Sequence, residues 1–287
     1  MKCALIILNY NDSHRAFELA QKSIEYDNID RVIIVDNKSI DNSLKYLQNK
    51  IDGIVKIDLL KARENRGFAS GNNIGAKYAI EKYKPQYVLF ANTDTIFEEK
   101  DIDECIRYMR DVENLGLVSM RIKDIKGREE KSAWKFKSFY EYAMFNTWLY
   151  RRLNYKKNTY TNYTEKFQLV QIVRGSFMFF NAKVLKNIGY FDEETFLYYE
   201  EEIISKKLQM NGYKVGLITD HFYIHNHIAG ASSNVWFIKK YMVKSLYYFL
   251  DKYYKIGKIK KTFFLLTIGI SYVEELGINT IKRIIKK

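Results

Sequence analysis

Length, composition and charge exclude several classes of protein. The chain has 287 residues, of which 47% are hydrophobic and 28% charged, with 24 Tyr, 18 Phe and one Pro, so disordered and collagen-like chains are excluded. Cys3 and Cys105 give neither a disulfide framework nor the paired spacing of a metal site, which favours a reducing, cytosolic compartment. The net charge of +13 indicates an anionic partner, unless it merely reflects a lysine-rich composition.

Residues 1–120 alternate between strand and helix patterns. The apolar stretch after Met1 is too short for a signal peptide and predicts a first strand at 4–8. Further strands are predicted at 31–35, near 54–58, at 87–91 and near 116–120, and helices near 13–26, near 41–50, from Gly71 to about 83 and near 100–113. Short Val- and Ile-rich strands separated by helices are typical of a parallel α/β sheet, here half of a doubly wound one.

The rest of the chain continues without a recognisable linker. Residues 121–165 are rich in aromatic and basic side chains and predict helices or a flap over the sheet. Strands are predicted near 176–181 and 214–219, a helix near 200–211, and only helices over 235–285. We therefore expect an α/β fold with a mostly parallel central sheet and a C-terminal helical extension, and not two independent domains.

Three polar motifs follow directly after predicted strands. They are Asn9-Tyr10-Asn11-Asp12, Asp36-Asn37-Lys38-Ser39 and Asn92-Thr93-Asp94. Ligands bind beyond the carboxyl ends of parallel strands, so these motifs describe one site. Asp36 could accept hydrogen bonds from a nucleotide base or ribose, and Asp94 could hold Mg²⁺ or Mn²⁺ beside a diphosphate. Taken singly, the motif at Asp36 is better explained by an ordinary turn, with Asp41 capping the next helix, and the motif at Asn92-Thr93-Asp94 is explained about as well by a turn.

A glycine-rich stretch extends from Asn65 to Gly75. Gly67 and Gly71 would let the backbone approach a ligand closely, and a helix beginning near Gly71 would direct free amides at a pyrophosphate. The spacing fits neither a Walker loop nor the dinucleotide fingerprint. Alone, this loop is weak evidence for a site.

Two further segments carry titratable groups. Glu200, Glu201 and Glu202 follow an aromatic stretch at a predicted helix start, where they suit the helix dipole or supply a general base, since an apolar environment raises the pKa of a carboxylate. His225 and His227 precede Gly230, Ser232 and Ser233, which suggests a metal-facing loop, although a lone histidine is more often structural.

In this order, the five motifs resemble the family 2 inverting glycosyltransferases of GT-A fold, and most of all their bacterial rhamnosyltransferase-type branch. The resemblance covers roughly residues 3–233 and is most specific at 65–75 and 189–213. It implies that Asp36 binds the nucleotide base. It also implies that Asn92-Thr93-Asp94 corresponds to the family's Asp-x-Asp metal motif, with Asn in the first place and the metal contact on Asp94.

The same resemblance assigns the chemistry. The family's Glu-Asp pair that supplies the catalytic base falls on Glu200-Glu201, with Glu201 preferred and Glu200 the alternative, while a later acid of that block is replaced by Ile203. The family's metal-binding histidine falls on His227, with His225 as the competitor. The implied nucleotide-sugar-binding residues are Asn9, Tyr10, Asp36, Asn37, Asn65, Gly67, Phe68, Gly71, Asn72, Asn92 and Thr93.

The resulting hypothesis is an inverting glycosyltransferase that requires Mg²⁺ or Mn²⁺. It would move a sugar from dTDP-rhamnose or a UDP-sugar to a hydroxyl of a surface-polysaccharide acceptor on a lipid carrier. Residues 1–234 would form the catalytic domain, with a nucleotide-binding half (1–120) and an acceptor-binding half (121–234). A nucleotidyltransferase would need a basic glycine-rich loop after the first strand. A nucleotide-sugar-binding protein remains an alternative, whereas a nucleic-acid-binding protein would not gather acids at strand ends.

Residues 235–287 form a basic, amphipathic extension. The longest uninterrupted apolar stretch, from Phe263 to Ile270, is less than half of the ~20 residues that span a bilayer. We expect the extension to lie on an anionic membrane, which would make the protein cytoplasmic and peripheral on the inner face of the cell membrane. Packing on the catalytic domain, or a contact between two copies of the chain, would explain the same pattern.

Overall fold

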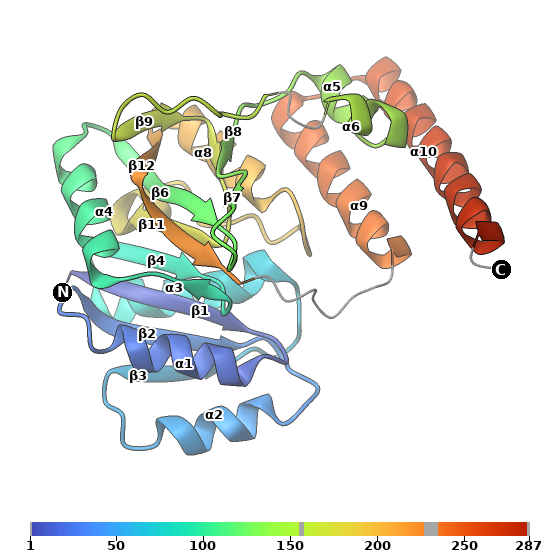
Figure 1. Ribbon diagram of the computed structural model, residues 1–287. Coiled ribbons are helices and arrows are strands. Elements are labelled where there is room, and N and C mark those ends of the chain that lie inside the picture. The colour runs from blue at the N-terminus through green and yellow to red at the C-terminus, as the bar shows by residue number, and fades with distance from the viewer. Residues whose placement is uncertain (1, 155–157, 227–234, 286–287) are drawn as a thin grey trace.

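The computed structural model describes residues 2–154, 158–226 and 235–285. Its centre is a mixed sheet with the strand order β3-β2-β1-β4-β11-β6-β12-β5 (Figure 1). These strands are β1 (Cys3–Asn9), β2 (Ile29–Asp36), β3 (Ile57–Lys61), β4 (Tyr87–Ala91), β5 (Thr95–Ile96), β6 (Leu115–Lys123), β11 (Phe177–Asn181) and β12 (Lys214–His225). β7 (Glu129–Glu130) pairs with β6, and β9 (Phe167–Val170) pairs with β12. β8 (Ala133–Trp134) and β10 (Ile172–Val173) form a second, two-stranded sheet.

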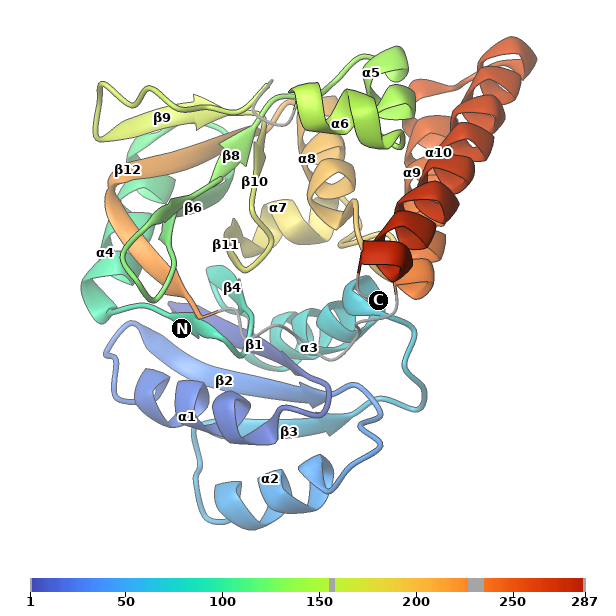
Figure 2. The same ribbon diagram turned by 45° about the vertical axis from the view of Figure 1, so that its right-hand side comes forward.

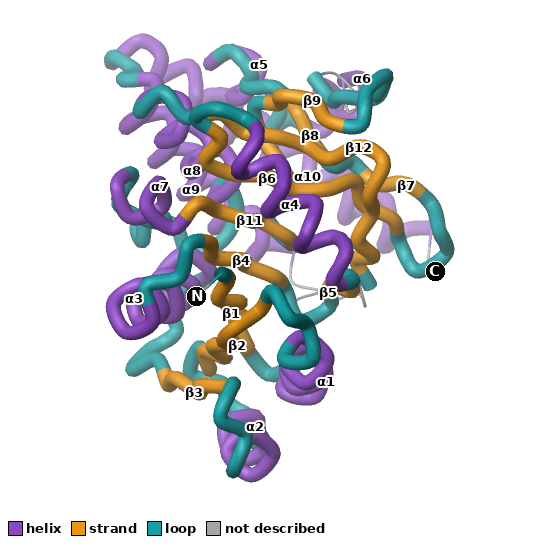
Figure 3. The backbone as a smooth tube through the Cα atoms, turned by 90° about the vertical axis from the view of Figure 1, so that its left-hand side faces the viewer, coloured by secondary structure: helices purple, strands orange, loops and turns teal. Residues whose placement is uncertain are grey.

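Helices cover both faces of the sheet, as expected for a doubly wound fold. One apolar cluster packs the odd residues of β1, such as Leu5 and Ile7, under α1 (Ser13–Ser23), α2 (Ser43–Ile51) and α4 (Glu99–Asp111). The other packs even residues, such as Ile6, under α3 (Phe68–Tyr83), α7 (Ala182–Asn187) and α8 (Glu200–Met210). Figure 3 shows α1 and α3 on opposite sides of β1 and β2. The alternation follows from the two-residue period of a strand.

The structure corrects several predicted details. β11 lies between β4 and β6 and runs antiparallel to both, a position in the sheet that the sequence did not predict. β11 is apolar on both faces, and a doubly buried strand carries no periodic signal of its direction. β3 begins at Ile57 rather than near 54, and α3 begins at Phe68 rather than near Gly71.

The C-terminal region forms two long helices, α9 (Val235–Tyr254) and α10 (Lys258–Ile285), which stand beside α5 (Phe139–Met144) and α6 (Trp148–Asn154) (Figure 2). Leu246, Phe249 and Leu250 of α9 are buried in one cluster with Tyr142 of α5 and Ile203 of α8. α9 therefore packs on the rest of the protein, which is one of the two alternatives to membrane contact that the sequence allowed for residues 235–287. None of the helices that the structure describes is both long enough and apolar enough to cross a bilayer.

Asp192 fixes α9 to the segment before α8. Its carboxylate accepts hydrogen bonds from Lys207 (2.9 Å) and from Tyr248, Lys252 and Tyr253 of α9 (2.8, 2.8 and 2.6 Å). Burial opposes ionisation, but these donors outweigh it and hold the pKa of Asp192 below its usual value. α9 is therefore anchored by charge as well as by apolar contact.

Candidate active site

The ends of β1 and β2 are joined through buried amide and carboxylate groups. Asn9 donates from Nδ2 to Asp36 (2.9 Å) and to the hydroxyl of Ser39 (3.2 Å). Asn37 donates to the side chain of Asn65 (3.1 Å) and to the carbonyl of Gly67 (3.2 Å). Asp36, Asn37, Asn65 and Gly67, predicted from separate motifs, thus belong to one connected cluster.

Asp12 connects this cluster to the motif after β4. Its backbone N–H donates to Oδ1 of Asn9 (3.1 Å), and its carboxylate accepts from the hydroxyl of Thr93. Arg15, in α1, donates to both oxygens of the same carboxylate, with Nε and Nη2 each 2.8 Å from an oxygen of Asp12. A continuous polar chain therefore leads from Asp36 to Thr93, and Asp12, although part of a quoted motif, was not assigned to the site from the sequence.

Asp94 lies beside His225, the last residue of β12. The Nε2 atom of His225 is 3.4 Å from Oδ1 of Asp94, and the backbone carbonyl of Asp94 accepts from Asn226 (2.8 Å). Burial alone would raise the pKa of Asp94. The hydrogen bond and charge of His225, together with the charge of Arg15, outweigh burial, so the pKa lies below its usual value. Asp94 is therefore ionised at neutral pH, as a metal-binding carboxylate must be.

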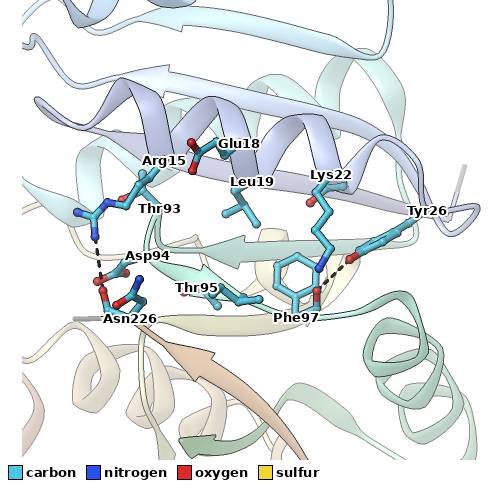
Figure 4. A pocket seen from close by; sticks show the side chains of 12 residues that line it. Arg15, Glu18, Leu19, Lys22, Tyr26, Thr93, Asp94, Thr95, Phe97 and Asn226 are labelled. Carbon is cyan, nitrogen blue, oxygen red and sulfur yellow. Dashed lines mark hydrogen bonds between the residues drawn. The ribbon is translucent and has the colours of Figure 1, made fainter. Parts of the chain in front are cut away.

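A cavity of about 250 Å³ opens beside this carboxylate, between α1 and the segment that leads into β5. Figure 4 shows Arg15 directed towards Asp94 and Asn226 at one end, with Tyr26 and Phe97 at the other. Of the residues predicted to bind the nucleotide sugar, only Thr93 lines it. It therefore borders the predicted donor site and does not coincide with it.

The glycine-rich loop packs against protein. Gly67 has φ +94°, and a Cβ there would lie 2.0 Å from the carbonyl oxygen of Phe196, while a Cβ on Gly71 would lie 2.4 Å from Leu8. Phe68 donates its backbone N–H to the same Phe196 carbonyl (3.0 Å). Close internal packing thus explains why both positions are glycine. The prediction that they are glycine to let a ligand approach the backbone is corrected. Asn72 is buried and donates to the carbonyl of Phe68 (3.0 Å).

The turn before α8 is strained. Tyr198 and Tyr199 both have left-handed backbones, with φ of 74° and 68°, which costs free energy for residues with a Cβ. Asn73 of α3 holds the preceding segment by donating to Phe191 and Glu193 (2.9 Å each). The chain therefore enters α8 along a fixed path that determines where its first glutamates point.

The three glutamates at the start of α8 have different surroundings. Glu200 is buried, its Oε1 meets no hydrogen-bond donor in the described chain, and burial, with the nearby Glu201, raises its pKa to about 8. Glu202 is also buried, accepts from the indole of Trp134 (3.0 Å), and has a raised pKa for the same two reasons. Glu201 lines a cavity of about 210 Å³ and accepts the backbone N–H of Gly175 (3.1 Å).

Residues 174–176 bring these glutamates next to the strand-end motifs. While Gly175 donates to Glu201, the carbonyl of the adjacent Ser176 accepts from the backbone N–H of Asn92 (3.0 Å). Two consecutive residues thus contact the candidate base and the first residue of the candidate metal motif. Arg174-Gly175-Ser176 was not predicted as part of the site, although it adjoins an apolar strand just as the predicted motifs do.

The remaining predicted residues have simple positions. Tyr10 is 43% exposed at the end of β1, so it is free to contact a ligand. His227 lies outside the described residues. Within the part of the chain that the structure describes, no group of three or more His, Cys, Asp or Glu side chains could hold a metal ion. A cation bound at Asp94 would therefore need further oxygen ligands from the substrate or from water.

Residues 5–189 match the family described as Glycosyl transferase family 2, and the chain belongs to this family. Its relatives include the low-salt glycan biosynthesis hexosyltransferase Agl10 of Haloferax volcanii, 24% identical over 225 residues, which are 78% of this chain and 66% of the relative. The rhamnosyltransferase WbbL of Escherichia coli K12 is 25% identical over 164 residues, 55% of this chain and 60% of the relative. The matches span less than two thirds of either relative.

Solved structures confirm the GT-A fold. The mannosyltransferase PcManGT of Pyrobaculum calidifontis, in complex with GDP-Man and Mn²⁺, has a TM-score of 0.57 at 15% identity, covering 97% of this chain and 75% of its own. GalNAc-T7 with UDP, GalNAc and Mn²⁺ has a TM-score of 0.64 at 12% identity, covering 88% and 49%. The predicted fold class, family and rhamnosyltransferase-like branch are thereby confirmed, and the family favours sugar transfer over the nucleotidyltransferase and nucleic-acid-binding alternatives.

Proposed function

We propose that the protein is a metal-dependent inverting glycosyltransferase that uses a nucleotide-diphosphate sugar. The observation that carries this proposal is the contact of Gly175 with Glu201 and of Ser176 with Asn92. Inversion needs a base on one side of the anomeric carbon and stabilisation of the leaving group on the other. A site in which adjacent residues hold both motifs is suited to that geometry.

Glu201 is the general base of this proposal. It lines a cavity and accepts the backbone N–H of Gly175, whereas Glu200 is buried and Glu202, which lines the same cavity, is held by the indole of Trp134. Glu201 takes the proton of an acceptor hydroxyl as that oxygen attacks the anomeric carbon. The new glycosidic bond forms as the bond between the anomeric carbon and the diphosphate oxygen breaks on the opposite face. Gly175 orients the carboxylate before the reaction.

Asp94, with His227 as the family resemblance implies, is the proposed metal site. The site fits Mg²⁺ or Mn²⁺, because Asp94 stays ionised and carboxylate oxygens are the ligands that both cations prefer. When bound, the cation would neutralise the charge that develops on the departing diphosphate. The protein's own part is to hold Asp94 in place, through His225 and the backbone of Asn226.

The donor we propose is dTDP-rhamnose or a UDP-sugar. Asp36 would bind its nucleotide base, and Asn9, Asn37 and Asn65 would surround the nucleotide. This rests on the connected cluster at the ends of β1 and β2 and on the family resemblance. A thermal-shift screen of nucleotide sugars with and without Mn²⁺ tests it, because a ligand that binds the native state raises the unfolding temperature. One nucleotide sugar should stabilise the protein only with Mn²⁺, and Asp94→Ala should abolish that shift. No Mn²⁺-dependent shift with any donor would contradict the proposal.

We further propose that the acceptor is a surface-polysaccharide precursor on a lipid carrier, and that α10 lies on an anionic membrane to reach it. The support is an exposed apolar stripe at helical spacing along α10, formed by Ile259, Leu266, Ile270 and Val273, with exposed Lys258 and Lys260 at one end. Because α9 is part of the core, deletion of the whole extension would disturb folding, and point variants are the better probe.

Vesicle sedimentation tests the membrane proposal. The protein should pellet with phosphatidylglycerol vesicles at low salt and be released as salt rises, since screening weakens the lysine contribution. Leu266→Ser combined with Val273→Ser should reduce pelleting, whereas Ile40→Ser, a control at an 83% exposed residue in the β2–α2 loop, should not. Equal pelleting of all three proteins would refute the role of α10.

A further inference from the structure

A cavity of about 510 Å³ lies next to the smaller cavity that Glu201 lines. Its walls include Lys131, Glu130, Tyr160, Tyr163 and Arg174. Arg174 also lines the smaller cavity at Glu201, so the two cavities adjoin at this side chain. Arg174 directly precedes Gly175, which contacts Glu201. A molecule that presents a hydroxyl to Glu201 could therefore extend into the larger cavity.

Two cations of this cavity have no anionic partner. Within residues 2–154, 158–226 and 235–285, neither Lys131 nor Arg174 forms a side-chain hydrogen bond or ion pair, and Nε of Arg174 is buried without an acceptor. Both lie over the ring of Trp134, at 4.4 Å and 5.9 Å from its centroid. Arg121, the other cation of the cavity, differs because it is paired with Glu129 and donates to the carbonyl of Thr219 (3.1 Å).

Leaving such groups unpaired costs free energy. Burial, reinforced by the nearby charge of Lys137, lowers the pKa of Lys131 to about 8. The carboxylates around it do not form a bonded partner: Glu130 lines the cavity, and Glu201 and Glu202 act only at a distance. A cation that is partly withdrawn from water normally has an anionic partner, so an anionic ligand would stabilise both Lys131 and Arg174.

We propose that this cavity binds an acidic group of the acceptor, a phosphate or a carboxylate, between Lys131 and Arg174, so that the acceptor is an anionic saccharide. The guanidinium of Arg174 can bind either group through two parallel hydrogen bonds, and Lys131 adds a point charge. Tyr160 and Tyr163 offer flat faces and polar edges for the sugar that carries the group. This inference rests on the proposed function, because it names the class of acceptor for the same site.

Binding of small anionic sugars to the full-length protein tests the proposal. Calorimetry in EDTA, which removes metal-dependent phosphate binding, compares α-glucose 1-phosphate, glucuronate and glucose. One or both anionic sugars should bind at least about tenfold more tightly than glucose, and Lys131→Met and Arg174→Met should each remove about that factor. Lys126→Met, at an exposed lysine in the β6–β7 loop, is the matched control and should bind as the unmodified protein does.

The two anionic sugars distinguish the source of the charge. Tighter binding of glucose 1-phosphate indicates a phosphate of the carrier, and tighter binding of glucuronate indicates an acidic sugar of the glycan. Equal binding of glucose and the anions would overturn the proposal, as would unchanged anion binding in both variants. Mn²⁺-dependent binding of the nucleotide sugar, measured on the same variants, should be unchanged, so a failure of the donor proposal is recognised separately.

A second measurement keeps the test decisive if Arg174→Met does not fold. Acylation of Lys131 by an amine-selective ester, followed by mass spectrometry, should slow several-fold with the tighter anionic sugar and not with glucose. Removing an unpaired cation should also leave the unfolding temperature of Lys131→Met unchanged or higher, whereas a structural role would lower it. No protection of Lys131 by either anion would overturn the proposal.

Discussion

Glu200 should make the stability of the protein depend on pH in a specific direction. Its carboxyl is buried, and its pKa rises from 4.5 in the unfolded chain to about 8 in the folded protein. A raised pKa means that its stabilising contribution is complete below pH 4.5 and is lost as pH rises through 8. At about 1.36 kcal/mol per unit, the loss could reach about 5 kcal/mol.

Glu200→Gln removes this titration and keeps the shape of the side chain. Urea unfolding followed by the fluorescence of the three tryptophans, at pH 5 and pH 8.5, gives the free energy of unfolding of each protein. The unmodified protein should lose several kcal/mol more than Glu200→Gln between these pH values, because all other titrating groups are common to both. Glu194→Gln, at an exposed glutamate six residues earlier, should behave like the unmodified protein. Equal losses in all three proteins would refute the assignment of a neutral, buried carboxyl to Glu200.

Other variants probe the remaining contacts. Gly67→Ala should cost about 2–4 kcal/mol of stability, because only glycine tolerates this backbone conformation and a Cβ would clash with Phe196. Gly53→Ala should cost less, because Gly53 has φ +78° but open space around it. Equal denaturation midpoints of the two variants would contradict this. Asp192→Asn should cost about 3 kcal/mol by urea unfolding, since it removes the counter-charge of the largely buried Lys207. An unchanged midpoint would show that α9 is not held by charge. Titration of the donor with Mn²⁺ should show a smaller loss of affinity in His227→Ala than in Asp94→Ala, and the reverse order would contradict the metal assignment.

The sequence predicts this fold where local patterns are strong. β1, β4 and α1 begin within a residue of their expected positions, because each strand is a continuous apolar run and a polar motif separates β1 from α1. The position of β11 could not be predicted, since strand order depends on contacts between distant segments and not on local periodicity.

The candidate site follows the same division. Asp36, Asn37 and Asn65 lie together because the carboxyl ends of parallel strands meet at one edge, which the sequence pattern indicates. The role of Gly175 and Ser176 depends on where β11 enters the sheet, so it could not be predicted. The close packing of Gly67 against Phe196 and of Gly71 against Leu8 could not be predicted, because these neighbours are distant in sequence.

The most direct test of the central claim is a comparison of Glu201→Gln with the unmodified protein, using the donor that the thermal-shift screen identifies. Donor affinity with Mn²⁺ and the rate of nucleoside diphosphate release in the presence of acceptor are measured on both. The proposed role of Glu201 predicts unchanged affinity and a rate lower by about 10²–10⁴-fold, the usual contribution of a general base. Near-normal release by Glu201→Gln, together with an inactive Glu200→Gln, would contradict it and move the base to Glu200.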